Sequence, residues 1–327
     1  MEKINYYALI MAGGSGRRFW PESTKDRPKQ YLNLASEKTL LEETLLRFEG
    51  LVDKSHRYIV TIKEQEALAK KYSSGLGLMP ENNLILEPLA RNTAPCIFLS
   101  LITLIKAGAK KNDMLIIAPS DHVILNKDAF KKDFFNALKV AEKNSSIVTI
   151  GIKPNFPHTG YGYIKTDAVA DAVADADAHK VKEFKEKPHF ELAKEYISKG
   201  YYWNAGMFVA SIETLLREFE THSPEIYKFY HRLGDLNLNQ KEQLKTEYQL
   251  MPSISIDYAI LEKSTRVNLI AANFDWSDLG SWETLSDVCK DKDKKNENYL
   301  VANNDRFFID DKSSNNIVRV EKEKLVV

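Results

Sequence analysis

The chain has 327 residues, about twice the usual length of a single domain, so one large domain with an appendage, or two domains, is expected. Its residues are 43% hydrophobic and 28% charged, with 14 Gly and 11 Pro, which excludes collagen-like, coiled-coil and broadly disordered proteins. Lys plus Arg and Asp plus Glu both number 46, so no net charge attracts the chain to nucleic acid or to an anionic membrane. Any recognition of phosphate must therefore be local.

The beginning of the chain does not predict a secretory signal, because its apolar run is short and no basic segment precedes it. The longest strongly apolar stretch, Ile97–Ile105, is interrupted by Ser100 and Thr103 and is shorter than the roughly 20 residues that span a bilayer. Cys96 and Cys289 match neither a disulfide framework nor a zinc site. We therefore expect a cytoplasmic protein with two reduced cysteines.

The first half of the chain alternates short apolar runs with amphipathic stretches. The apolar runs predict buried strands at Tyr6–Met11, Arg57–Ile62, Leu84–Leu86 and Met114–Ala118. The stretches between them predict helices at Leu40–Phe48, Glu64–Tyr72, Thr93–Ala107 and Ala129–Glu142. This alternation indicates an α/β fold with a mostly parallel sheet covered on both faces. Ligands bind at the carboxyl ends of such strands, so the loops after Met11, Leu86 and Ala118 should share one rim.

The second half has a more mixed pattern, which suits a substrate-binding region. It predicts strands at Ile147–Ile152, Gly162–Thr166, Lys180–Lys185 and Met207–Ala210, and helices near Ile212–Glu220 and Ile254–Glu262. The aspartate-rich segment Asp167–His179 favours a solvated hairpin tip, because it lacks the glycine and the closing glutamate of an EF-hand loop.

A charged run after Cys289 marks a boundary. We place one domain at residues 1–289, followed by a linker and a short β-rich C-terminal element at residues 290–327. Strand-like runs in that element occur at Tyr299–Ala302, Phe307–Ile309, Ile317–Val320 and Leu325–Val327. Because the chain stops inside a strand pattern, the element is expected to be short or truncated.

A glycine-rich loop follows the first strand directly. It consists of Ala12, Gly13, Gly14, Ser15, Gly16 and Arg17. Glycines let a backbone approach a ligand closely and turn its N–H groups toward an anion. The loop matches neither the Walker pattern nor GxGxxG, but Lys25, Arg27 and Lys29 follow it in a stretch stiffened by Pro21 and Pro28, which suits a polyphosphate. The alternative is a solvated basic loop.

Polar residues also follow the third and fourth strands. Glu87 and Arg91 lie on the expected rim, next to Asn92 and Thr93, either of which could cap the following helix. Asp121 ends the fourth strand where a carboxylate can hold a hard cation against phosphate oxygens, although it could equally cap a turn or helix.

A second candidate carboxylate is Asp278, between two tryptophans. Because Mg²⁺ takes one or two carboxylates and completes its octahedron with water and phosphate oxygens, Asp121 plus Asp278 would suffice. The alternative is that Asp275 or Asp278 caps the next helix. Further along, Glu186, Lys187 and Asn204 are groups that bind sugar hydroxyls and a phosphate, or are surface strand ends.

Taken in order, seven motifs resemble the mannose-1-phosphate guanylyltransferases, or GDP-mannose pyrophosphorylases, of the sugar-nucleotidyltransferase superfamily. These motifs are AGGSGRRFWPESTKDRPKQ, EPLARNTAP, PSDH, FKEKP, YWNAGMF, SIDYAILEK and WSDLGSW. The resemblance runs from Tyr7 to about Trp282. It implies a Rossmann-like α/β/α nucleotide-diphospho-sugar transferase fold, a homodimer, and the reaction of GTP with mannose 1-phosphate to give GDP-mannose and pyrophosphate. Ala205 and Cys96 depart from the family, in which Ser and Ala are common.

The resemblance also implies roles for individual residues. Residues 13–17 would cradle the triphosphate, Arg17 and Lys29 would be catalytic, and Asp121 and Asp278 would hold Mg²⁺. The hexose and its phosphate would be bound by Gly162, Glu186, Lys187, Asn204 and Asp257. The nucleotide would be bound by the glycine-rich loop together with Glu87, Arg91 and Asn92.

The expected mechanism is direct in-line attack on the α-phosphorus of GTP without an enzyme nucleophile, so catalysis reduces to alignment and charge screening. Base choice follows from chemistry: guanine presents two adjacent donors, which match the two oxygens of a carboxylate, and Glu87 is the candidate. The alternative is that Glu87 pairs with Arg91 while backbone groups read the base. Two rival functions stay open: the same reaction with another hexose 1-phosphate or nucleotide, and an inactive sugar-nucleotide sensor subunit.

Overall fold

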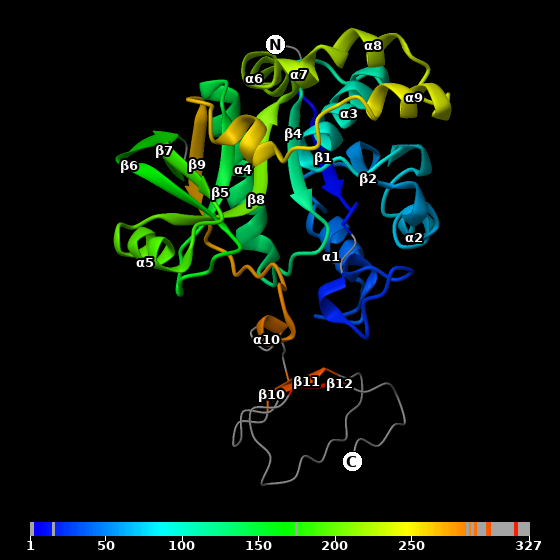
Figure 1. The fold of residues 1–327 in the computed structure, drawn as a ribbon. Helices are drawn as coiled ribbons and strands as arrows, with labels where there is room; N and C mark the ends of the chain where they lie inside the picture. The colour runs from blue at the N-terminus through cyan, green and yellow to red at the C-terminus, as the bar shows by residue number, and fades with distance from the viewer. Residues whose placement is uncertain are drawn as a thin grey trace.

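The computed structural model describes residues 3–14, 17–173, 176–285, 288, 291–292, 299–301 and 317–319. A nine-stranded sheet with helices on both faces dominates these residues (Figure 1). Its strands lie in the order β3-β2-β1-β4-β8-β5-β9-β7-β6, and β8 also pairs with β6. The predicted α/β fold with a mixed sheet is confirmed.

The strands of this sheet cover most of the predicted runs. They are β1 (Tyr6–Met11), β2 (Arg57–Ile62), β3 (Leu84–Glu87), β4 (Met114–Pro119), β5 (Ile147–Ile152), β6 (Gly162–Val173), β7 (Ala176–Glu186), β8 (Tyr202–Ser211) and β9 (Val267–Ala271). The first four strands are mutually parallel, as the β-α alternation predicts. The mixed pattern of the second half corresponds to β8, which runs antiparallel to both β4 and β5, and to the antiparallel pair β6 and β7.

The helices fill the connections between strands. They are α1 (Leu40–Arg47), α2 (Glu66–Lys71), α3 (Thr93–Lys106), α4 (Lys127–Asn144), α5 (Phe190–Ser198), α6 (Ile212–His222), α7 (Pro224–Tyr227), α8 (Phe229–Asp235), α9 (Lys241–Tyr248) and α10 (Trp282–Leu285). Helix α1 starts with a capping box, in which Thr39 and Glu42 satisfy each other's backbone N–H groups. Its predicted start at Leu40 is therefore set locally.

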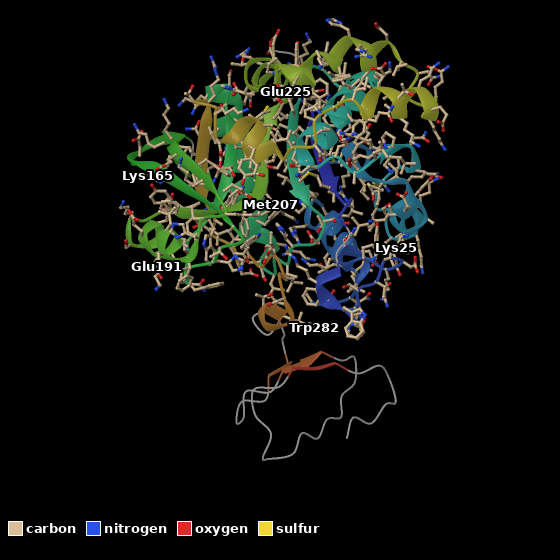
Figure 2. All side chains as sticks on the ribbon, viewed as in Figure 1. Lys25, Lys165, Glu191, Met207, Glu225 and Trp282 are labelled. Carbon is tan, nitrogen blue, oxygen red and sulfur yellow. The ribbon has the colours of Figure 1, made fainter. Side chains whose placement is uncertain are left out.

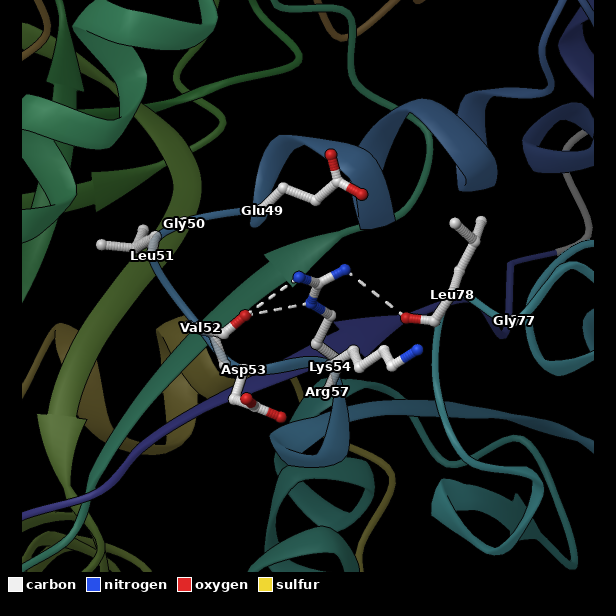
Figure 3. A pocket seen from close by; sticks show the side chains of 9 residues that line it. All are labelled: Glu49, Gly50, Leu51, Val52, Asp53, Lys54, Arg57, Gly77 and Leu78. Atoms are coloured by element: carbon white, nitrogen blue, oxygen red, sulfur yellow. Dashed lines mark hydrogen bonds between the residues drawn. The ribbon is translucent and has the colours of Figure 1, made fainter.

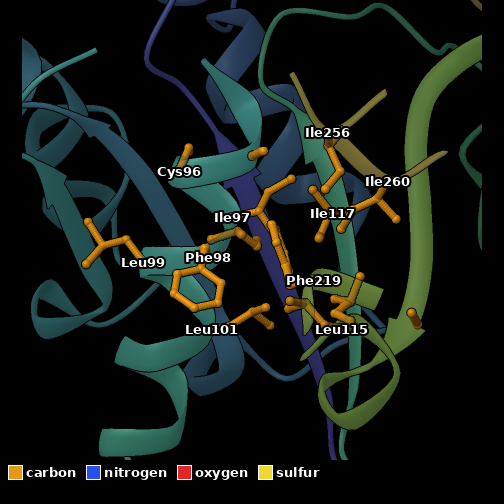
Figure 4. Close-up of a cluster of buried hydrophobic side chains, with 14 of the residues drawn as sticks. Cys96, Ile97, Phe98, Leu99, Leu101, Leu115, Ile117, Phe219, Ile256 and Ile260 are labelled. Atoms are coloured by element: carbon orange, nitrogen blue, oxygen red, sulfur yellow. The ribbon is translucent and has the colours of Figure 1, made fainter. Parts of the chain in front are cut away.

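Two hydrophobic clusters pack on opposite faces of the sheet. One is built around α3, whose turns are buried on nearly every side because its sequence is almost entirely apolar, and it includes Leu115, Ile117 and Phe219 (Figure 4). The other lies under α1 and α4. Burial of apolar area on both faces fixes the sheet between two helical layers.

Two predicted elements differ from the structure. The segment Asp167–His179 belongs to a hairpin of β6 and β7, as predicted, but these strands extend through most of it, and Ala178 is buried where β7 pairs with β9. Ala occupies every second position of this segment and alternates with Asp or Val, which is a strand pattern, and neighbouring β9 supplies a partner strand. The expected helix Ile254–Glu262 is a short π-helix at Asp257–Leu261.

Of the C-terminal element, the structure describes β10 (Asp291–Lys292), β11 (Tyr299–Val301) and β12 (Ile317–Arg319), which form a separate small sheet. Two predicted runs therefore correspond to strands, while Phe307–Ile309 and Leu325–Val327 lie outside the described residues, as does Cys289. The division into residues 1–289 and 290–327 stays a prediction. Among the helices that the structure describes, none is long and apolar enough to cross a membrane.

Candidate functional site

The candidate site begins at the carboxyl ends of β1, β3 and β4. Because these strands are parallel, Ala12 after β1, Glu87 at the end of β3 and Asp121 after β4 meet at one edge of the sheet, as predicted. The basic stretch and the loop around Asp278 contact the same edge through Lys29, which touches both aspartates.

The glycine-rich loop is held from behind by two glutamines. The Ala12 carbonyl accepts hydrogen bonds from Gln30 Nε2 at 3.0 Å and Thr61 Oγ1 at 2.8 Å, and the Gly14 carbonyl accepts from Gln30 and Gln65, each at 3.1 Å. These carbonyls are thereby satisfied inside the protein. The sequence analysis does not predict this role for Gln30 and Gln65, because no characteristic spacing marks a glutamine that supports a loop. Ser15, Gly16 and the Arg17 side chain lie outside the described residues.

The basic stretch divides into an outward and an inward part. Lys25 and Arg27 are exposed, and Lys25 projects at the surface of the molecule (Figure 2). Lys29 is only 4% exposed, and its ammonium donates to Asp121 Oδ2 at 3.0 Å and to the carbonyl oxygen of Asp278. The alternative of a solvated basic loop is therefore wrong for Lys29 and correct for the other two.

Both residues proposed as metal ligands contact the same ammonium, Asp121 through its carboxylate and Asp278 through its backbone carbonyl. Burial pushes the pKa of Asp121 up, but the positive charge and hydrogen bond of Lys29 outweigh it and leave that pKa below its usual value, so Asp121 is an anion at neutral pH. The Asp278 carboxylate accepts a 2.6 Å hydrogen bond from the hydroxyl of Tyr161 at Oδ1. The sequence does not predict this partner, because 117 residues separate Tyr161 from Asp278.

The alternative helix-capping roles of these aspartates are wrong. Asn126 caps α4 by accepting from the backbone N–H of Ala129, so Asp121 does not. Asp275 accepts from the backbone N–H groups of Leu125 and Asn126 at 2.7 and 2.8 Å, which ties two loops together. Helix α10 begins at Trp282, beyond both Asp275 and Asp278.

The donor set fits a divalent cation of the hard type. Within the described ranges, no three His, Cys, Asp or Glu side chains are grouped to hold a metal ion by themselves. One carboxylate at a buried ammonium, with a second aspartate whose carbonyl binds the same ammonium, is the kind of partial site that Mg²⁺ uses when substrate phosphates and waters supply the remaining oxygens. Asp121 and Asp278 are thus chemically suited to it.

A second group of polar residues lies where β6, β7 and β8 meet. Gly162 pairs with Glu186 across β6 and β7, and a Cβ atom on Gly162 would lie 2.6 Å from Glu186 Oε2. A larger residue at position 162 would therefore force the Glu186 carboxylate to move. Lys187 follows with a positive φ of 48° and pairs its ammonium with Glu186. The structure brings these three predicted residues together.

Asn204 and Asp257 complete this second group. The amide Nδ2 of Asn204 donates to Asp257 Oδ1 at 3.1 Å, and its Oδ1 accepts from Thr149 Oγ1 at 3.1 Å and from the Gly206 N–H at 3.2 Å. The amide is thus fixed in one orientation. Burial, followed by repulsion from Glu186, raises the pKa of Asp257 to about 6.

Aromatic side chains connect the two groups, because Tyr161 donates to Asp278 through its hydroxyl and accepts from the Lys187 N–H through its carbonyl oxygen. Tyr161 stacks on His158 with ring centroids 3.8 Å apart and lies edge-on to Trp203 and Trp276, at 5.1 and 5.3 Å. Trp276 Nε1 donates to His122 Nδ1 at 3.1 Å. Burial lowers the pKa of His122 to about 4, so this imidazole is neutral and accepts that hydrogen bond.

Glu87 lies behind the glycine-rich loop. It is 5% exposed, its Oε1 is 3.6 Å from the position that a Cβ of Gly13 would occupy, and its Oε2 accepts from the hydroxyl of Tyr248 at 2.9 Å. Arg91 does not pair with Glu87 in the described part of the chain; it donates to the carbonyl of Met251 at 2.7 Å. The predicted alternative of a Glu87–Arg91 ion pair is therefore wrong.

Asn92 behaves as the predicted helix cap. Its side chain accepts from the backbone N–H of Thr93 at 2.8 Å, and its backbone adopts a φ of 66°. This cap sets the direction in which α3 leaves the rim. The side-chain amide nitrogen takes no part in the capping hydrogen bond.

A cavity of about 550 Å³ lies at the other end of β2 (Figure 3). It surrounds Arg57, the first residue of that strand, whose guanidinium donates to the backbone carbonyls of Leu45, Val52 and Leu78. The cavity is lined by Glu49, Gly50, Leu51, Val52, Asp53, Lys54, Arg57, Gly77 and Leu78. Since Arg57 starts β2, the cavity is separate from the rim formed by the carboxyl ends.

Comparison with known proteins identifies related chains. The family described as Nucleotidyl transferase matches residues 7–295. Mannose-1-phosphate guanylyltransferase of Escherichia coli strain K12 is 34% identical over 88% of this chain and 60% of its own length. The enzyme of the same name from Salmonella muenchen is 34% identical over 96% of this chain and 68% of its own length. This chain therefore spans about 60% of the first of these relatives.

A solved structure shows the same arrangement. The crystal structure from Thermus thermophilus described as a mannose-1-phosphate geranyltransferase is 35% identical, with a TM-score of 0.80, over 92% of this chain and 83% of that one. The two chains therefore share their fold over nearly all of the length of this one.

Proposed function

Because this chain belongs to the nucleotidyl transferase family and groups there with the mannose-1-phosphate guanylyltransferases, we propose that it transfers GMP from GTP to mannose 1-phosphate. The products would be GDP-mannose and pyrophosphate. The observation that carries the proposal is the buried Lys29, whose ammonium joins Asp121 of the nucleotide rim to the Asp278 loop. A buried cation thereby connects the loop after β4 to the loop that carries Asp278.

The reaction needs no enzyme nucleophile. A phosphate oxygen of mannose 1-phosphate attacks the α-phosphorus of GTP, the new P–O bond forms, and the bond to the bridging oxygen breaks as pyrophosphate leaves. A phosphate monoester is already ionised at neutral pH, so no general base is required. The protein would contribute alignment and charge stabilisation, and Lys29 and Arg17 would face the phosphoryl oxygens.

Nucleotidyltransferases of this family generally use a divalent metal, and we propose Mg²⁺, held by Asp121 and Asp278. The ion would neutralise charge on the phosphates as the transition state forms. Tyr161 keeps the Asp278 carboxylate oriented through its 2.6 Å hydrogen bond. Lys29 keeps Asp121 deprotonated and therefore ready to bind a cation.

The nucleotide would lie on the glycine-rich loop formed by residues 12–17, with Arg91 and Asn92 nearby. Glu87 would read the base, because a carboxylate offers two acceptors to the N1–H and the 2-amino group of guanine. The position of its Oε1 next to the Cβ-less Gly13 supports this role. Uracil and thymine present an acceptor where guanine presents a donor, so they would be rejected.

The hexose would be bound by the second group of residues. Gly162 lets the Glu186 carboxylate lie directly against the β6 backbone, where it would accept from a sugar hydroxyl, and Asn204 and Asp257 supply further hydrogen-bonding groups. Lys187 would contact the sugar phosphate, since its side chain is 58% exposed and its ammonium is held by the neighbouring Glu186.

The test is turnover of GTP and mannose 1-phosphate with Mg²⁺, followed by pyrophosphate release, against a panel of other hexose 1-phosphates and nucleotides. Preference for this pair supports the proposal. Higher kcat/KM with another pair would assign the first rival function, and binding without turnover would assign the inactive sensor.

We also propose that the enzyme is a cytoplasmic homodimer, which light scattering of the purified chain and cell fractionation would test.

A further inference from the structure

The proposed recognition of guanine by Glu87 requires a deprotonated carboxylate, although this side chain is buried. A buried carboxylate loses its hydration, so burial raises the pKa of Glu87 and favours its protonated form. A protonated glutamate presents a donor to the base and no longer matches the two donors of guanine. Recognition of guanine therefore requires neighbouring groups that keep Glu87 deprotonated and its carboxylate in a fixed orientation.

Two such groups reach Glu87 from the helical layer behind β3. The hydroxyl of Tyr248, at the end of α9, donates to Oε2 at 2.9 Å, and the buried thiol of Cys96, in the first turn of α3, lies close enough to the same carboxylate to lower its pKa. Both groups lower the pKa of Glu87, the Tyr248 hydroxyl more than the Cys96 thiol. Burial raises the pKa of the Tyr248 hydroxyl and of the Cys96 thiol well above their usual values, so both remain donors at neutral pH.

Tyr248 is also held in place. It is completely buried, and the segment that follows it is joined to the start of α3 through three hydrogen bonds. Arg91 Nη1 donates to Met251 O at 2.7 Å, Ala94 N donates to Ile254 O at 3.1 Å, and Ile256 N donates to Thr93 Oγ1 at 2.8 Å. The hydroxyl of Tyr248 thus approaches Glu87 from a fixed direction, although the partners lie 161 residues apart in the chain.

We propose that Tyr248 is a specificity-determining positioning residue, which with Cys96 fixes the Glu87 carboxylate in the orientation that selects guanine. The inference rests on the proposed base-reading role of Glu87. Each carboxylate oxygen has two acceptor sites, so Oε2 can bind Tyr248 and still accept one donor from the base. With its remaining acceptor sites facing Gly13, Glu87 favours a base with two adjacent donors and repels a base with a carbonyl at the 2-position.

The test compares GTP with ITP, whose base lacks only the 2-amino group. Binding is measured by titration calorimetry with Mg²⁺ and without mannose 1-phosphate, so that no turnover occurs. A charge-assisted hydrogen bond predicts that the wild-type protein binds GTP about 10- to 100-fold more tightly than ITP. The ratio of the two dissociation constants reports base reading separately from folding, because a variant with a general defect weakens both nucleotides equally.

Three variants divide the outcomes. Glu87→Gln should lower the ratio of the ITP and GTP dissociation constants nearly to one, because it replaces one acceptor with a donor. Tyr248→Phe should lower this ratio about 3- to 10-fold. Tyr201→Phe is the matched control: Tyr201 is also buried and donates to the carboxylate of Glu183 at 2.7 Å, but not to Glu87. The control should leave the ratio unchanged.

The failures are distinguishable. An unchanged ratio in Tyr248→Phe, with a collapsed ratio in Glu87→Gln, overturns the role of Tyr248 and leaves base reading by Glu87 standing. An unchanged ratio in Glu87→Gln overturns both, while turnover of GTP with mannose 1-phosphate still decides the transferase function. Should Tyr248→Phe not fold, Cys96→Ala removes the other donor with a smaller change in volume, and it should reduce the ratio about 2- to 3-fold; no reduction overturns the proposal.

Discussion

Asp257 should lower the stability of the protein at neutral pH, and replacing it with asparagine should restore that stability. The carboxylate has a pKa of about 6 in the folded protein against 3.8 as its ordinary value, chiefly because of burial and then because of Glu186. A difference of about two pKa units corresponds to at most about 3 kcal/mol of unfolding free energy. The asparagine side chain would keep an acceptor for the amide of Asn204 and carry no charge.

The sign of the pH dependence follows from proton binding. Between pH 3.8 and about 6 the folded state holds a proton that the unfolded state has released, so the unfolding free energy falls as the pH rises through this range. Above about pH 6 the full penalty is present, and below about pH 4 it is absent. The stability advantage of Asp257→Asn should therefore be largest above pH 6 and vanish near pH 4.

The assay is urea denaturation of wild type and variant at several pH values between about 4 and 8, with the midpoint and slope compared at each pH. Asp235→Asn is the control, because Asp235 is exposed and its substitution should change stability by well under about 1 kcal/mol at every pH. The KM for mannose 1-phosphate should rise in Asp257→Asn although the protein is more stable. A variant that is less stable at about pH 7.5, or a difference that is independent of pH, would refute the reasoning.

Three further changes test the site. Lys29→Ala should lower kcat about 10²- to 10³-fold. It should also reduce thermal stability, because Asp121 and the Asp278 carbonyl lose the donor that they share. Unchanged turnover in steady-state kinetics would show that Lys29 is not catalytic. Asp121→Asn and Asp278→Asn should each raise the Mg²⁺ concentration needed for the half-maximal rate. Because both residues act on one ion, the double variant should lose far less activity than the sum of the two single losses. Additive losses of activity would argue for separate roles. Gly162→Ala should raise the KM for mannose 1-phosphate at least about 10-fold with little change in the KM for GTP, because its Cβ would displace Glu186; equal changes in both would place Gly162 outside the sugar subsite.

Burial distinguishes Lys29 from the other cations of the basic stretch. The sequence does not distinguish the cations Lys25, Arg27 and Lys29 from one another. Only the resemblance to the family selects Lys29 as the catalytic one. In the structure Pro28 leads into the short helix Lys29–Tyr31, whose residues are all buried. Burial of a cation is tolerated only beside anions or carbonyl oxygens, and Asp121 and the Asp278 backbone supply these.

Much of the architecture was determined by the sequence alone. The apolar runs β1, β2, β4 and β5 begin where predicted, because buried parallel strands read as short continuous apolar segments, and helices α1 and α3 start at side chains that cap them locally. The alternation of these elements was enough to place the loops after β1, β3 and β4 on one rim. These features depend on interactions within a few residues.

Only the tertiary structure decided which polar residues act together. Tyr161 contacts Asp278, Tyr248 contacts Glu87 and Asn204 contacts Asp257, across 117, 161 and 53 residues of chain. No local pattern encodes such partners, because they are set by strand order and by the register of β8 between β4 and β5. A hydrogen bond forms only when donor and acceptor approach within about 3 Å, and that distance is fixed by packing of the sheet and its two helical layers.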